Sequence, residues 1–104
     1  MTNSVKRIPP HNEEAEQYVL GCLLLDSSSF EPVQKRIDSS MFYNKANQNV
    51  YISLQAVFMS GIPVDIISVS EQMKKDNTLN ESGGVEYLNK LASQIVSSSS
   101  AEYY

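Results

Sequence analysis

The feature that most constrains the fold is the way the first helix is set up. Between residues 8 and 25, two prolines precede Asn12 and an acidic turn, and an apolar run follows directly. Proline disfavours helix in the residue before it, so residues 1–10 are expected to form an extended, flexible N-terminal arm. Asn12 can accept a hydrogen bond from a free amide at a helix start, and the acidic turn complements the helix dipole. The sequence therefore predicts a helix at 13–25 that enters a packed core.

The apolar residues of this helix predict its buried face. We expect an inward-facing stripe formed by Ala15, Val19, Cys22 and Leu23. Leu20 and Leu24 are expected to widen this stripe. Cys22 cannot form an internal disulfide because it is the single cysteine, and its apolar neighbours predict a small buried hydrophobe.

Apolar residues recur at helical spacing in three further stretches. They predict helices at 30–37, 46–60 and 84–96. Pro32 fits within a first helical turn, and Gly61 is expected to stop the second of these helices. Serines 39 and 40 begin a single turn that is expected to carry Phe42 into the core.

Two segments are locally ambiguous. The β-branched residues after Val64 favour a strand, but Asp65 is a good N-cap and the apolar spacing is helical, so we expect a helix. Ser68 with Glu71 would also form a capping box, so this helix could begin later, with 64–67 extended. Near the C-terminus, the serines at 97–100 are expected to end the helix of 84–96, with Ser99 and Glu102 capping a last segment.

Length and charge limit the possible functions. A chain of 104 residues with 41% apolar residues can form one core, and the pattern predicts an all-α, compact, five- or six-helix orthogonal bundle without a sheet. A net charge of −4 argues against direct DNA binding, since that affinity comes largely from neutralising phosphates. Protein surfaces are therefore the expected partners. No apolar run approaches the length of a membrane span and the first residues do not form a signal peptide, so a cytoplasmic protein is expected.

The residues that could carry chemistry do not form a recognisable set. His11 has no second histidine or cysteine at ligand spacing, so no metal site is expected. The glutamates at 13, 14 and 16 are explained by the helix dipole rather than by acid–base catalysis. The glycines at 83 and 84 lack the lysine and serine or threonine of a phosphate-binding loop. We therefore predict no catalytic, cofactor-binding or metal-binding residue in this chain.

The order of short motifs closely resembles the N-terminal domain of bacterial replicative DNA helicases of the DnaB family. The resemblance covers residues 8–104 and is carried by Pro9-Pro10-His11 with Glu14-Ala15-Glu16-Gln17, Val19-Leu20-Gly21, Leu23-Leu24-Leu25-Asp26, Phe42-Tyr43, Gly61 with Pro63-Val64-Asp65, Gly83-Gly84 with Tyr87-Leu88, and Glu102-Tyr103-Tyr104. Family members resemble two-part proteins in which this helical domain precedes a RecA-like ATPase.

This resemblance implies a role in assembly. The N-terminal domains resemble a collar of paired subunits in a hexameric ring, and they help to recruit primase and, in some bacteria, a helicase loader. The resemblance implies that residues 11–104 form this collar domain, truncated before a helical hairpin, a linker and the ATPase. ATP and Mg²⁺ are then expected for the parent ATPase, and none for this fragment.

Two other functions remain open at this stage. The helicase-binding C-terminal domain of a primase shares a related small helical fold, and a small DNA-binding helical module is disfavoured mainly by charge. Partner contacts are expected at exposed positions of the 84–96 helix and at the chain end, where the missing hairpin would adjoin; these are Glu86, Asn89, Lys90, Tyr103 and Tyr104.

Overall fold

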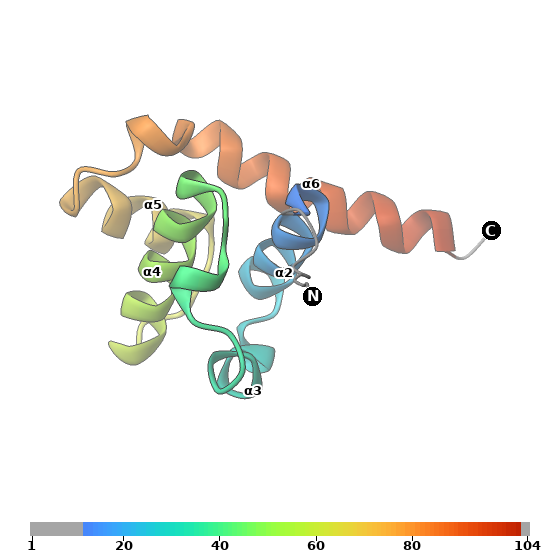
Figure 1. The fold of residues 1–104 in the computed structure, drawn as a ribbon, viewed down its shortest axis with the longest axis horizontal. Helices are drawn as coiled ribbons and strands as arrows, with labels where there is room; N and C mark the ends of the chain where they lie inside the picture. The colour runs from blue at the N-terminus through green and yellow to red at the C-terminus, as the bar shows by residue number, and fades with distance from the viewer. Residues whose placement is uncertain (1–11, 103–104) are drawn as a thin grey trace, which may run out of the picture.

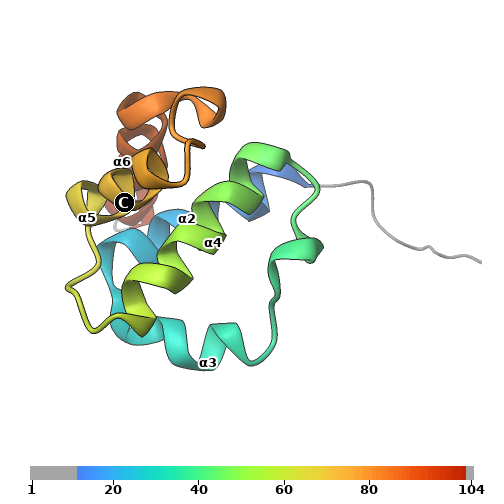
Figure 2. The same ribbon diagram turned by 90° about the vertical axis from the view of Figure 1, so that its left-hand side faces the viewer.

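The computed structural model describes residues 12–102, with side chains described to residue 95. Over this range it contains five α-helices and no strand, which confirms the predicted all-α fold (Figure 1). The helices are α2 (Glu13–Leu25), α3 (Phe30–Gln34), α4 (Lys45–Met59), α5 (Ile66–Lys75) and α6 (Gly84–Glu102), and single 3₁₀ turns lie at Ser27–Ser29, Ser39–Met41 and Asn80–Ser82. Turned by 90°, the ribbon shows α4 running through the middle, with α3 on one side and α5 and α6 on the other (Figure 2).

Helix α2 has the predicted boundaries, but its buried face is rotated from the predicted one. The side chain of Asn12 accepts a hydrogen bond from the Ala15 amide at 3.0 Å, which confirms the N-cap. Leu20, Leu23 and Leu24 are fully buried, whereas Ala15 is exposed. Val19 and Cys22, the other members of the predicted stripe, are half-buried. The prediction is thus confirmed for the three leucines and wrong for Ala15, because both α4 and α6 pack on α2 and burial is centred between these two helices.

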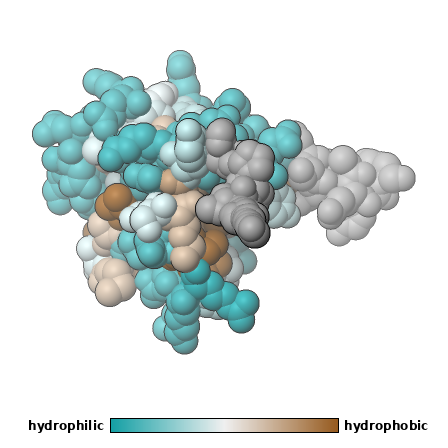
Figure 3. Space-filling view, in the orientation of Figure 1, coloured by the Kyte–Doolittle hydropathy of each residue, from teal (hydrophilic) through white to brown (hydrophobic). Residues whose placement is uncertain are grey.

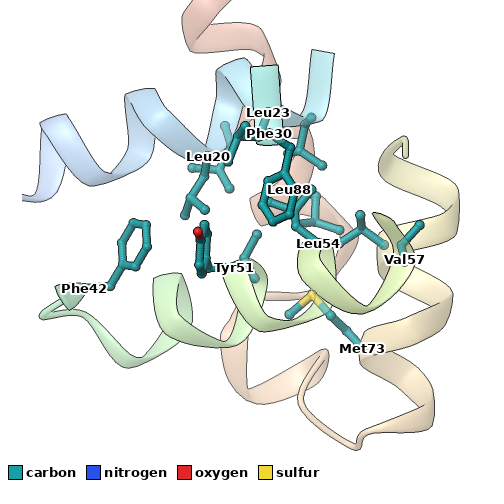
Figure 4. Packing of buried hydrophobic residues seen from close by; sticks show 13 residues of the cluster. Leu20, Leu23, Phe30, Phe42, Tyr51, Leu54, Val57, Met73 and Leu88 are labelled. Carbon is teal, nitrogen blue, oxygen red and sulfur yellow. The ribbon is translucent and has the colours of Figure 1, made fainter. Parts of the chain in front are cut away.

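Tyr51 of α4 lies at the centre of the core (Figure 4). Its ring packs between Phe30, at a centroid distance of 5.7 Å, and Phe42, at 5.1 Å. Its hydroxyl donates a hydrogen bond to the Ile37 carbonyl at 2.6 Å, so the polar end of this buried side chain is satisfied. Phe42 is 4% exposed, which confirms that the turn before α4 carries it into the core.

Helix α3 ends at Gln34, three residues before the predicted end. The Ile37 carbonyl accepts a hydrogen bond from the Tyr51 hydroxyl. Asp38 has an extended conformation and caps the turn that follows. Asp38 accepts from the Ser40 amide and hydroxyl, and these bonds lower the pKa of its carboxyl. The Ile37 amide still donates to the Val33 carbonyl at 2.8 Å, so the chain leaves helical geometry only at the extended Asp38.

The two ambiguous segments are both helical. Asp65 and Ser68 form a reciprocal capping box, with Asp65 accepting from the Ser68 amide at 2.7 Å, so α5 starts at Ile66 and the later start at Ser68 was wrong. Helix α6 continues through the serines to Glu102, so the predicted break at 97–100 and the cap at Ser99 were also wrong. Serine is only mildly unfavourable inside a helix, and no proline or glycine follows Gly84 to stop it.

Candidate protein-interaction surface

The carboxylate of Glu16 joins the first turns of two helices. It accepts hydrogen bonds from the Tyr43 amide at 2.7 Å and from the side-chain amide of Asn47 at 2.8 Å. Asn44, which caps α4, donates from its side chain to Glu13 at 2.7 Å and accepts from the Ala46 amide. The acidic first turn therefore complements the dipole of α2, as predicted, and also fixes the start of α4 against it.

Asn47 extends this network to α6. It is completely buried, and its side-chain oxygen accepts a hydrogen bond from the Tyr87 hydroxyl. Burial raises the pKa of Tyr87, a hydrogen bond with Gln17 opposes that increase, and the carboxylates of Glu13 and Glu16 add to it. Both ends of the Asn47 amide are thus satisfied, and a fully satisfied buried network holds α2, α4 and α6 in one arrangement.

The turn before α6 is held by a second polar contact. Asn49 of α4 donates from its side chain to the Ser82 hydroxyl at 2.9 Å and to the Glu81 carboxylate at 3.1 Å. Gly83 and Gly84 have φ angles of 105° and 71°, a region that favours glycine. The segment between α5 and α6 therefore ends in a defined turn that sets the direction in which α6 leaves.

Helix α6 crosses α2 at very close range. A Cβ atom placed on Gly21 would lie 2.4 Å from the Leu91 carbonyl oxygen and 2.6 Å from Cγ1 of Ile95. On the same side of α6, Leu88 and Leu91 are fully buried. The helix continues beyond this crossing, and its last turns extend away from the other helices (Figure 1).

Three of the predicted partner-binding residues share one exposed face of α6. Glu86, Asn89 and Lys90 are spaced three and four residues apart, and all three are exposed. We call these three residues the α6 polar face. Tyr103 and Tyr104 lie outside the described residues. The structure thus brings the first three together on the side of α6 opposite its buried leucines.

Sequence reasoning did not identify the surface grooves. An apolar groove of about 230 Å³ lies between α2 and the segment before α4, and a groove of about 330 Å³ with mostly polar lining residues lies between α4 and α5. On the face in Figure 3, apolar side chains gather between hydrophilic regions above and below them. Each groove combines residues from segments distant in the sequence, so no local pattern could have indicated it.

The part of the chain that the structure describes lacks two kinds of feature. No group of three histidine, cysteine or acidic side chains there could hold a metal ion. None of the described helices combines the length and the apolar character needed to cross a membrane.

Comparison with known proteins shows one family. The model of the DnaB-like helicase N-terminal domain matches residues 8–104. The replicative DNA helicase DnaB of Geobacillus stearothermophilus is 36% identical over 99 residues, which cover 95% of this chain and 22% of that helicase. DnaB of Treponema pallidum is 36% identical over 98 residues, and DnaC of Bacillus subtilis is 33% identical over 98, each covering 94% of this chain and 22% of the relative.

A solved structure has the same fold. The crystal structure of the N-terminal domain of DnaB helicase from Mycobacterium tuberculosis superimposes with a TM-score of 0.78 at 35% sequence identity, covering 83% of this chain and 60% of that one. The chain spans about a fifth of the length of the helicases it matches. The matching family is that of the helicase and not of the primase domain that the sequence had left open. This chain belongs to the DnaB-like helicase N-terminal domain family.

Proposed function

We propose that this chain acts as a protein-binding domain of a replicative DNA helicase, supporting the assembly of its subunits and the docking of primase or a helicase loader. The observation that carries the proposal is the arrangement of α6. One side of this helix packs into the core through the buried Leu88 and Leu91, and the other side exposes the α6 polar face. Because this helix is already ordered before a partner binds, binding to its exposed face costs little additional conformational entropy.

The electrostatics support protein rather than DNA as the partner. Twelve acidic residues against eight basic ones give the chain a charge of −4, whereas DNA affinity depends on basic groups that neutralise phosphates. DNA unwinding with ATP and Mg²⁺ is proposed for the whole helicase and not for the residues described by this structure.

The experiment is a binding titration of the chain with primase, and separately with the loader, from the same organism. The test variant replaces the α6 polar face with alanine (E86A, N89A and K90A). The control replaces Glu31, Gln34 and Lys35, which have the same spacing and the same types of side chain at α3. We expect the α6 variant to weaken binding at least about tenfold, which one or two lost contacts can cause.

Two further measurements complete the test. Deleting residues 1–104 from the full helicase should weaken its hexamer in analytical ultracentrifugation and reduce its stimulation by primase. The proposal is wrong if assembly and stimulation are unchanged, or if the two triple variants bind both partners equally well.

A further inference from the structure

The groove beside the first turns of α2 is apolar and open at the surface. Its lining residues are Ala15, Glu16 and Val19 of α2 and Ile37, Met41 and Phe42 of the segment before α4. Phe42 is 4% exposed and Met41 is 62% exposed, so the two apolar side chains lie at the base and the rim. We call this the α2 groove.

The chain that precedes α2 can reach this groove. Residues 1–11 join α2 at Asn12 and lie outside the described structure. Ile8 is four residues before Asn12, and four extended residues span at most about 14 Å. Val19 is seven residues after Asn12, about 10 Å along the helix. If the chain reverses direction at Asn12, Ile8 therefore reaches the level of Val19.

The chemistry of the arm complements the groove. Ile8 supplies an apolar side chain, and Pro9 and Pro10 restrict the backbone, which lowers the entropy lost on docking. Residues 1–11 contain Lys6 and Arg7 and no acidic residue. The remaining residues contain all twelve acidic side chains and six basic ones, and three of those acidic groups are in the first turn of α2.

We propose that the α2 groove is the docking site for the N-terminal arm of the same chain. Ile8 packs against Val19, Met41 and Phe42, and the basic pair before it lies over the acidic first turn of α2. The arm thereby covers an apolar surface and ties α2 to the segment before α4. This inference does not depend on the proposed partners of α6.

The test uses nuclear magnetic resonance of the 104-residue chain labelled with ¹⁵N. Ile8→Ser should shift the backbone amides of Val19, Met41 and Phe42, and deletion of residues 1–11 should shift the same amides. The matched control is Ile67→Ser, because Ile67 is 71% exposed on α5 and does not line this groove. The control should leave the groove amides unchanged.

A distance measurement gives a second readout that a general loss of stability does not imitate. A spin label at a cysteine replacing Val5, with Cys22→Ser as background, should broaden the groove amides and spare those of α5. The double variant K6E and R7E should reduce this broadening, as should high salt, which screens exposed charges.

Two results would overturn the proposal. One is an unchanged set of groove amides in Ile8→Ser together with no broadening from the label. The other is groove amides whose shifts depend on protein concentration in the intact chain and do not respond to Ile8→Ser, which would identify a second copy of the chain as the occupant.

Discussion

The close crossing of α2 and α6 predicts that Gly21→Ala destabilises the domain. The added Cβ would lie 2.4 Å from the Leu91 carbonyl oxygen, whereas ordinary contacts begin near 3.4 Å. The two helix backbones must therefore separate by about 1 Å, because a main-chain carbonyl cannot rotate away as a side chain can. Such overpacking costs about 1–3 kcal/mol.

An opposing effect must be subtracted. Alanine favours the helix over glycine by about 1 kcal/mol at an interior position. The clash with backbone places the cost in the upper part of its range, so we expect a net loss of about 1–2 kcal/mol in the free energy of unfolding. For a domain of this size, that lowers the melting temperature by about 4–16 °C.

The assay is urea unfolding followed by circular dichroism, with Ser93→Ala as the control. Ser93 is an exposed position of α6, where alanine improves helix propensity without a steric conflict, so its effect should stay within about 0.5 kcal/mol. A Gly21→Ala variant as stable as the original chain, beside an unaffected control, would refute the argued backbone contact.

Four further outcomes follow from particular contacts. Tyr87→Phe leaves the buried oxygen of Asn47 without its donor and should lower the unfolding free energy by about 1–3 kcal/mol in urea; no change would show that the bond is not needed. Asp65→Ala removes the capping box of α5 and should cost about 1 kcal/mol in thermal unfolding, and a smaller loss after prior removal of Ser68 would identify the box as the cause. Ser53→Ala should be neutral or stabilising by up to about 1 kcal/mol, because the Ser53 hydroxyl is buried without a hydrogen-bond partner among the described residues; a clear loss would indicate an unseen partner. Burial raises the pKa of Tyr51 and Tyr87 above the usual value near 10, so their contribution to stability is complete below that pH and lost as the pH rises further. Unfolding free energies measured from pH 8 to 11 should therefore fall at the alkaline end, and a flat profile would contradict the assignment.

Local signals predicted the helix starts well. Asn12 and Asp65 each cap a helix as their sequence neighbourhood indicated, because an N-cap needs only a side-chain acceptor two or three residues before free amides. Gly61 ends α4 with a φ of 77°, as expected of a glycine after a helix. The motif order also resembled the helicase family that the comparisons then showed.

Local signals failed where a distant residue decides the outcome. The Ile37 carbonyl accepts a hydrogen bond from Tyr51 of α4, and nothing near Ile37 in the sequence indicates that donor. The break predicted in the serine run was wrong because a preference for caps was counted as a helix stop. The partner-binding role of Glu86, Asn89 and Lys90 stays a prediction.

The sequence by itself determined the all-α class, most helix starts and the family. These depend on residue spacing and on contacts within one helical turn, which are readable along the chain. Only the tertiary structure decided which face of α2 is buried, why Gly21 must lack a side chain, and how Glu16, Asn47 and Tyr87 meet. These features arise where segments tens of residues apart pack against each other, and no local sequence pattern predicts the geometry of that packing.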